Sequence, residues 1–142
     1  MRVGAEQIPG PAMRRCGYAP QSDRFAEGLS PREIVGLVAR LRGAPAADVE
    51  RSLDEAGIAE PLRDRVVPRD ADLPHVALAC ATVGDPDLLL LDQPADDAVT
   101  LAGVARARER GAAVLVAMRE AGPDLRAALG SAELRLVEGR PG

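Results

Sequence analysis

Lysine is absent from this sequence, because all 18 basic residues are arginines, and His75 is the only histidine. Chemistry that needs a lysine ammonium or a second imidazole is therefore excluded. Aromatic residues are nearly absent as well, with Tyr18 and Phe25 alone, so the chain lacks the stacking platforms that bind single-stranded nucleic acid. The net charge is −4 and basic residues alternate with acidic ones, so no basic stripe indicates a nucleic-acid partner.

Cysteine and long apolar segments are also scarce. Cys16 and Cys80 lie far apart and belong to no CxxC or Cys/His grouping, which favours buried thiols over a disulfide framework or a metal site. A reducing cytoplasm is the expected compartment. The N-terminus has no signal-peptide h-region, and the apolar runs are too short to cross a bilayer. We therefore expect one cytoplasmic domain without direct membrane insertion.

Residues 30–83 are expected to be mainly helical. Ser30-Pro31-Arg32-Glu33 reads as a capping box with proline at the first helical position, and apolar residues then recur at helical spacing up to Gly43. Further helices are predicted over residues 46–56, 60–65 and 73–83, the last one capped by Asp72. Before this helical part we expect a short strand within residues 14–19 and a polar loop over residues 21–29.

Strands and helices alternate in residues 84–142. Four leucines, Leu88 to Leu91, precede Asp92 and predict a strand that is buried on both faces. Further strands are expected over residues 113–117 and 133–138, and helices over residues 100–110 and 123–129. This alternation predicts βαβ units on a parallel sheet, and hence an α/β fold.

Several segments, taken in order, resemble the ATP-binding domain of ABC transporters. Val76–Pro94 resembles the segment from the signature helix through the Walker B strand, and Gly17-Tyr18-Ala19-Pro20-Gln21 resembles the Q-loop. Ser30–Gly43 is similar to the first helix of the helical subdomain, most closely in the multidrug and lipid exporter branch. Ala113–Glu120 and Ala132–Gly139 resemble the H-loop strand and the closing strand.

The resemblance implies a truncated P-loop NTPase-like parallel sheet with a helical subdomain inserted into it. Residues 1–142 would form a single degenerate domain. Within it, residues 1–29 would be the entry and Q-loop region, residues 30–83 the helical subdomain, and residues 84–142 the α/β portion from Walker B to the C-terminus.

The resemblance also implies a nucleotide site, from which this sequence departs. Residues 1–15 correspond to the family's segment after the P-loop, so the P-loop is expected to be missing. The signature motif, LSGGQ in the family, aligns with Pro68-Arg69-Asp70-Ala71-Asp72. Two carboxylates there would repel a triphosphate, whereas the family's motif places serine and backbone N–H groups against it.

Three further family positions are substituted. Gln93 replaces the catalytic glutamate, Val99 the D-loop aspartate and Arg119 the H-loop histidine. Gln21 and Asp92 remain, but a lone carboxylate is a poor Mg²⁺ site, so Asp92 is expected to be structural. We predict no enzymatic activity and no cofactor, with ATP and Mg²⁺ not binding tightly.

Three hypotheses about the function stay open at this point. The favoured hypothesis is a pseudo-ATPase that serves as an interaction or regulatory subunit of a membrane exporter. Its partners would be an ABC permease, an intact ABC ATPase subunit, or both, at the inner face of the plasma membrane. The alternatives are a fragment of an ATP-binding ABC transporter subunit whose P-loop another chain supplies, or a decayed relic without function.

The expected partner surface is Gln21, Phe25 and Leu29 with the adjoining helix of residues 30–43. Phe25 is either an anchor in this surface or core filler. For the other polar candidates we expect no catalytic role: His75 has no recognisable Ser, Cys or metal-ligand partner, and Asp70, Asp72, Asp96 and Asp97 are interpreted as helix caps or solvated loop residues.

The missing P-loop strand has a consequence for the sheet. In the family it lies between the strands that match residues 113–117 and 133–138, and its loss leaves unpaired backbone groups on both sides. Residues 134–137 would then pair directly with residues 114–116, which is the favoured outcome. Alternatively, a partner chain would supply the strand by β-augmentation.

Overall fold

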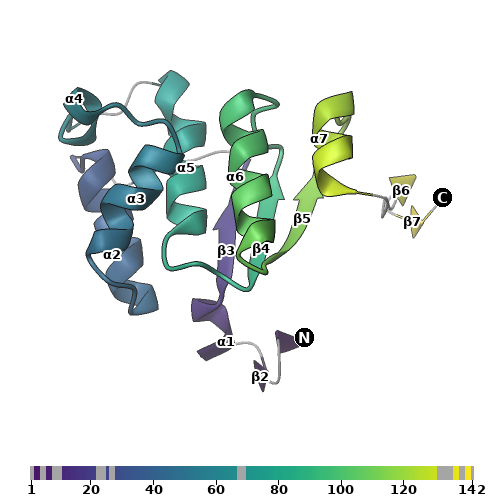
Figure 1. Ribbon diagram of the computed structural model, residues 1–142, viewed down its shortest axis with the longest axis horizontal. Helices are drawn as coiled ribbons and strands as arrows, with labels where there is room; N and C mark the ends of the chain where they lie inside the picture. Colours follow the sequence, from purple (N-terminus) through teal and green to yellow (C-terminus); the bar gives the residue numbers. More distant parts are fainter. Residues whose placement is uncertain are drawn as a thin grey trace.

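Three parallel strands with helices packed on one face form the centre of the molecule (Figure 1). This computed structural model describes residues 2–3, 6–7, 11–21, 25, 28–66, 70–130, 136–137 and 140–141. The strand order is β3 (Cys16–Ala19), β4 (Leu88–Asp92) and β5 (Ala113–Ala117). Long crossover connections make all three strands parallel, as the alternation of strands and helices predicts.

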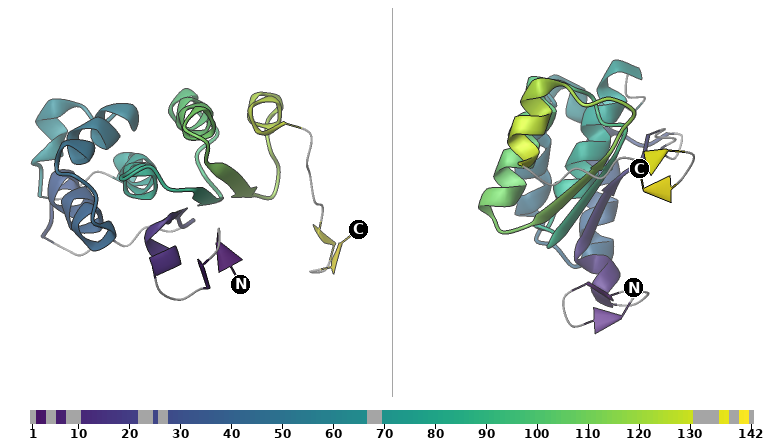
Figure 2. Two further views of the ribbon diagram at one scale, coloured as in Figure 1. Left: turned by 60° about the horizontal axis from the view of Figure 1, so that its bottom comes forward. Right: turned by 90° about the vertical axis from the view of Figure 1, so that its right-hand side faces the viewer.

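Three helices cover one face of this sheet, and Figure 2 shows them on the same side. They are α5 (Leu73–Thr82), α6 (Ala98–Glu109) and α7 (Pro123–Leu129). Every second strand residue points toward these helices. Leu89 and Leu91 of β4 are buried there, together with Val104 of α6 and Leu125 of α7. This cluster is the core of the α/β part.

A second core lies within the helical part, which follows β3 and precedes α5 in the sequence. It is built by α2 (Pro31–Arg42), α3 (Ala47–Glu55) and α4 (Glu60–Arg63). Helices α2 and α3 pack against α5, and α4 packs against α2. Val35, Leu53 and Val76 are fully buried in it. The predicted helices agree with these bounds to within a residue or two.

Helix α5 belongs to both cores. Its residues 76–81 are all buried, with Val76, Ala79 and Cys80 facing the helical core and the other three facing the sheet core. The contact with β3 is close enough that a Cβ at Gly17 would collide with the carbonyl oxygen of Ala81. Glycine at position 17 therefore sets the separation between the sheet and its central helix.

The remaining elements are short: β1 (Arg2–Val3), β2 (Glu6–Gln7), α1 (Pro11–Arg14), the 3-10 turn η1 (Asp70–Asp72), β6 (Leu136–Val137) and β7 (Arg140–Pro141). The predicted closing strand over residues 133–138 is wrong in its pairing, because β6 pairs antiparallel with β7 and not with β5. A partner only a few residues away in sequence closes a small loop at low entropic cost. Residues 133–135 and 138 lie outside the described residues.

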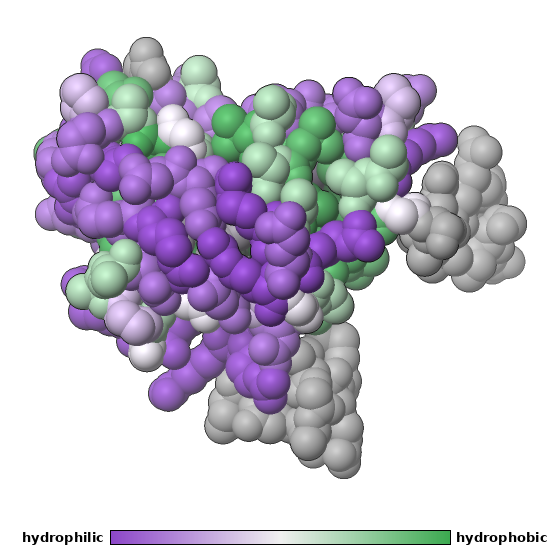
Figure 3. Space-filling view, viewed as in Figure 1, coloured by the Kyte–Doolittle hydropathy of each residue, from purple (hydrophilic) through white to green (hydrophobic). Residues whose placement is uncertain are grey.

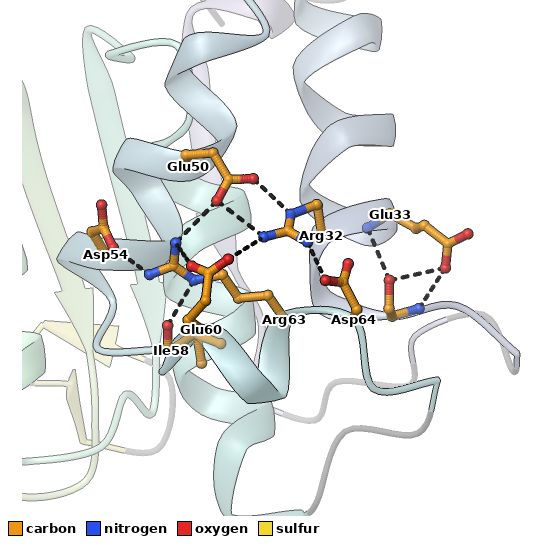
Figure 4. Close-up of polar contacts among 9 residues, drawn as sticks. Arg32, Glu33, Glu50, Asp54, Ile58, Glu60, Arg63 and Asp64 are labelled. Carbon is orange, nitrogen blue, oxygen red and sulfur yellow. Dashed lines mark hydrogen bonds and ion pairs between the residues drawn. The ribbon is translucent and has the colours of Figure 1, made fainter.

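The start of α2 is fixed by the predicted capping box, which Figure 4 shows. The backbone N–H of Ser30 donates to Glu33 Oε2 at 2.8 Å, and the N–H of Glu33 donates to Ser30 Oγ at 3.4 Å. The N–H and the hydroxyl of Ser30 both donate to Oε2 of Glu33, and these two hydrogen bonds lower the pKa of its carboxyl group. The helix ends as predicted at Gly43, whose φ of 73° lies in the left-handed region that glycine adopts without strain.

Two arginines join α2, α3 and α4 through carboxylates (Figure 4). The guanidinium of Arg63 is buried, donates to the carbonyl oxygen of Ile58 at 2.9 Å and forms ion pairs with Glu50, Glu60 and Asp54. Arg32 binds Glu50 at 2.7 Å and also pairs with Glu60 and Asp64. Because each arginine shares carboxylates with the other, the three helices are tied into one network.

A further ionic network connects α3 with α6. Glu55 pairs with Arg110 and Arg106, and Arg110 also pairs with Asp85 at 3.3 Å. The hydrogen bond from Arg110 holds the pKa of Glu55 below its usual range. On the side seen in Figure 3, hydrophilic surface accordingly covers much of the helical part, and hydrophobic surface gathers toward α6 and α7.

The capping box predicts the effect of Ser30→Ala. The substitution leaves the N–H of Glu33 without its acceptor, and we expect a loss of about 0.5–2 kcal/mol in the free energy of unfolding, measured by urea denaturation. Ser30→Thr keeps the hydroxyl and serves as the control, with a smaller loss. A variant with alanine that unfolds at the same denaturant concentration as the wild type would contradict this assignment.

The network around Arg32 predicts a pH-dependent effect of Arg32→Gln. The hydrogen bond from Arg32 is the main cause that lowers the pKa of Glu50. A carboxylate with a lowered pKa stabilises the fold above its unfolded-state value, about 4.3, and this contribution is lost as the pH falls through the folded-state pKa.

We therefore expect wild type and Arg32→Gln to differ most at neutral pH, and only modestly, since these side chains are partly exposed. The difference should shrink below about pH 4. Urea unfolding at several pH values measures it. A difference that stays constant down to about pH 3 would show that Glu50 gains nothing from Arg32.

Candidate functional site

Four candidate residues follow the carboxyl ends of the parallel strands, which meet at one edge of the sheet. Gln21 lies two residues after β3, Asp92 ends β4 with Gln93 directly behind it, and Arg119 lies two residues after β5. Parallel sheets bind ligands at this edge. These four residues are all described, and no hydrogen bond or ion pair joins their side chains. They share a place in the fold without forming a connected cluster.

Gln93 has an unusual backbone. Its φ of 49° lies in the left-handed region, which residues other than glycine rarely adopt. The N–H of Gln93 donates to the carbonyl oxygen of Ala117 at 2.7 Å, so the end of β4 is held to the end of β5. Asp92 and Gln93 are both half-buried. The backbone at the end of β4 is thus held in place. The side chain of Gln93, however, is an amide, which accepts no proton from a bound water.

The segment aligned with the signature motif leads into α5. Pro68 and Arg69 lie outside the described residues, while Asp70, Ala71 and Asp72 form the 3-10 turn η1. The prediction that Asp72 caps α5 is wrong, since its side chain makes no capping hydrogen bond to that helix. Its ψ of −17° is helical, whereas a capping residue has the extended backbone that aims its side chain at the helix N–H groups.

His75 has a partner that the sequence did not indicate. Its Nε2 lies 2.8 Å from Oδ2 of Asp97, which links the first turn of α5 to the first turn of α6. Asp97 also accepts from the N–H of Thr100 at 2.8 Å and so caps α6, as expected for a helix cap. Burial would raise the pKa of Asp97, but these hydrogen bonds outweigh it and leave the pKa below the usual range.

The same cap corrects the predicted start of α6. The helix begins at Ala98, two residues before the predicted Thr100, because Asp97 supplies its first acceptor. Asp96 accepts from the N–H of Gly122 at 3.1 Å and ties the start of α6 to the start of α7. Val99, predicted to take the D-loop position, packs against the sheet core. These aspartates therefore join helix ends.

ATP and Mg²⁺ are the ligands that the family resemblance implies, and the described residues do not fit them. No three His, Cys, Asp or Glu side chains within the described ranges group to hold a metal ion. Asp92 is the only carboxylate among the four strand-end candidates, whereas Mg²⁺ requires several oxygen ligands in octahedral geometry. Asp70 and Asp72 add negative charge at the position predicted to match the signature motif, where a phosphate would need N–H donors.

A groove of about 640 Å³ lies between α2 and α3, on the outer side of the helical part. Leu29, Gly36, Leu37, Ala46 and Val49 give it an apolar lining, and Arg32, Glu33, Arg40 and Glu50 give it a charged lining. Leu37 is 43% exposed, so an apolar side chain is available within it. An apolar groove with charged side chains suits an amphipathic helix from another protein.

Of the predicted partner residues, only Leu29 is part of the lining of this groove, and the three lie in different environments. Leu29 lines the groove and packs against the helical core, and Gln21 is exposed. Phe25 is half-buried and packs against both cores. Its contacts are those of core filler, the second of the two roles predicted for it.

No helix within the described ranges is long and apolar enough to span a membrane. Comparison with protein-family models gives no match. The chain is nevertheless similar in sequence to several curated proteins. The chain is 31% identical over 129 residues to the human phospholipid-transporting ATPase ABCA3, covering 80% of this chain and 8% of that protein.

Two more relatives extend this result. The rat ATP-binding cassette sub-family A member 7 is 38% identical over 98 residues, which are 62% of this chain and 4% of that protein. The aliphatic sulfonates import ATP-binding protein SsuB 2 of Burkholderia lata is 36% identical over 103 residues, which are 70% of this chain and 37% of that protein. The chain thus spans well under half the length of each of these relatives.

The fold agrees with these relatives. A solved structure described as the ATP-binding subunit of an ABC transporter superposes with a TM-score of 0.61 at 24% identity, covering 76% of this chain and 50% of that one. The α/β sheet with its inserted helices is therefore part of a P-loop NTPase-like fold. The relatives identify this chain as part of an ABC-transporter ATP-binding domain, and the solved structure shares its fold.

Proposed function

We propose that this chain is a non-catalytic ABC-type domain that acts by binding other subunits of a membrane exporter. The observation that carries the proposal is Gln93. It occupies a fixed position at the end of β4, directly after Asp92, and its amide cannot act as a general base toward an attacking water. The carboxylates of η1 and the exposed Arg119 add two further departures from a nucleotide site.

The groove between α2 and α3 is the binding surface in this proposal. Its apolar lining includes Leu29 and the exposed Leu37, and two of its charged side chains, Arg32 and Glu50, pair with each other and hold α2 against α3. A preformed groove of this kind binds a helix with little ordering cost. The partner would be the permease subunit of the exporter, which would place the chain at the cytoplasmic face of the membrane.

A second candidate function is an ATP-binding subunit that another chain completes. It is favoured by the share of 37% that the chain covers of its relative SsuB 2. Even a P-loop supplied in this way would face Gln93 and the carboxylates of η1. The completed domain would then bind a nucleotide weakly and would not hydrolyse it at a useful rate.

The first test is nucleotide chemistry on the purified chain. We expect no saturable binding of ATP with Mg²⁺ by titration calorimetry, and no phosphate release above the background without protein. Gln93→Glu should not restore turnover, since a carboxylate alone does not bind the phosphates. Asp92→Ala is the matched control: a magnesium-dependent turnover that this variant abolishes would disprove the non-catalytic assignment.

The second test is capture of the permease. The tagged chain is incubated with detergent-solubilised membranes of the organism that encodes it, and bound membrane subunits are identified by mass spectrometry. We expect Leu37→Asp to reduce the captured permease at least about tenfold, because a charge enters the apolar lining of the groove, a loss of about 1.4 kcal/mol or more. Leu41→Asp is the matched control, since Leu41 lies on the same helix, is 67% exposed and does not line the groove.

Phe25→Ala separates stability from binding in the same assay. We expect it to lower the free energy of unfolding by about 2 kcal/mol, because a half-buried phenyl ring leaves both cores. Permease capture should persist below the melting temperature. Loss of capture without loss of stability would instead make Phe25 an anchor in the partner surface.

A further inference from the structure

The groove between α2 and α3 contains two charges that remain available for a partner, Glu33 and Arg40. Arg40 is exposed and makes no hydrogen bond or ion pair with the residues that the structure describes. Glu33 is also exposed, and Figure 4 shows its carboxylate pointing away from the arginine network. The other two charges of the groove, Arg32 and Glu50, pair with each other. A partner in the groove therefore meets one available carboxylate and one available guanidinium.

These two charges lie on one face of α2, seven residues apart. Seven residues make almost two helical turns and a rise of about 10 Å. Gly36 and Leu37 lie between the charges and also line the groove. The matching partner carries a cation and a carboxylate at the same spacing, in the reverse direction. Helix α2 of a second copy, running antiparallel, has this arrangement.

Antiparallel pairing of α2 with itself satisfies both charges at once. With a two-fold axis between Gly36 and Leu37, Glu33 of each copy faces Arg40 of the other, and Leu37 faces Gly36. Parallel pairing would instead place like charges opposite each other. The order of charges on α2 therefore favours an antiparallel, two-fold symmetric contact.

Gly36 is a second observation that points to a close contact on this face. It lies in the middle of α2, where glycine destabilises a helix relative to alanine. No contact within the described part of the chain requires glycine here, because a Cβ would meet only Nη1 of Arg40, at 3.9 Å. The absent side chain leaves room for Leu37 of a second copy, which is 43% exposed in the single chain.

We propose that two copies of this chain associate through α2, and that this dimer covers the groove until a permease takes its place. Leu37 lies in the contact with either partner, so the two exclude each other. A contact made mainly by one helix from each copy is small, and the dimer should dissociate at micromolar concentrations. The association does not depend on the proposed function, whereas the competition with a permease rests on it.

Sedimentation velocity of the purified chain, over a range of concentrations, measures the association. We expect a monomer–dimer equilibrium for the wild type that weakens as salt rises, because the paired charges are exposed. Arg40→Glu should raise the dissociation constant at least about tenfold, since two carboxylates then face each other at both symmetric contacts. Gly36→Ala should also weaken the dimer, yet raise the melting temperature of the monomer, because alanine favours the helix.

A mixture of two variants tests the pairing of Glu33 with Arg40. Arg40→Glu leaves carboxylates at both positions and Glu33→Arg leaves guanidinium groups at both, so neither variant should dimerise alone. Mixed one to one, they should form a heterodimer, because every contact between the two copies then joins opposite charges. Glu33→Arg also removes part of the helix cap. Ser30→Ala is the control for that loss and should dimerise as the wild type does.

Leu37→Cys tests the competition with a permease. In a Cys16→Ser background, which removes the half-buried native thiol, the introduced thiols lie beside the two-fold axis and should form a disulfide between copies. The oxidised dimer should capture at least about tenfold less permease from solubilised membranes than the same variant after reduction. Each sample is thus its own control for the substitution.

Three results would overturn the dimer: a wild-type chain that stays monomeric at about 1 mM, an Arg40→Glu variant that dimerises as the wild type does, or a mixture without heterodimer. A disulfide-linked dimer that captures permease as well as its reduced form does would overturn the competition. If the wild type captures no permease but the mixture forms a heterodimer, the permease proposal fails, and the competition with it, while the α2 dimer stands.

Discussion

Helix α5 is packed on two sides at once, and both cores of the molecule depend on that packing. Its buried stretch, Val76 to Ala81, is short-chained apart from Leu78 and carries no charge. A helix that is apolar all round belongs in an interior, and small side chains let its neighbours approach closely. The approach is closest at Gly17 of β3, because any side chain there would collide with the backbone of α5. The sheet and the helical part are thereby held against one element.

A charged side chain satisfies the carbonyl groups at the end of α5. Arg42, at the end of α2, donates to the carbonyl oxygens of Ala81 and Val83 at 3.0 and 2.9 Å. Carbonyl groups in the last turn of a helix lack partners within it, and a guanidinium satisfies two of them. Burial lowers the pKa of Arg42, which is the cost of bringing this cation close to the core. Arg42 thus satisfies carbonyl oxygens at the end of α5, as the backbone N–H of Gly43 does at the end of α2.

Local sequence signals predicted most of this fold, and contacts between distant residues account for what they missed. The Ser30 capping box, the Leu88–Asp92 strand and the helix over residues 123–129 are each specified by neighbours within one turn or one strand. The pairing of His75 with Asp97, 22 residues apart, depends on α5 and α6 lying side by side. No periodicity encodes that. The network of Arg32 and Arg63 likewise depends on how α2, α3 and α4 pack together, which the local sequence does not specify.

The sequence predicts where the candidate site lies in the fold, but it does not predict which hydrogen bonds its residues make. Parallel strands bring Asp92, Gln93 and Arg119 to one edge whatever their side chains are. The left-handed backbone at Gln93 makes the same point, since it is held by the hydrogen bond to Ala117 in β5. A main-chain bond of this kind does not depend on the side chain, so the geometry of this strand end would be the same with an acid or an amide at position 93.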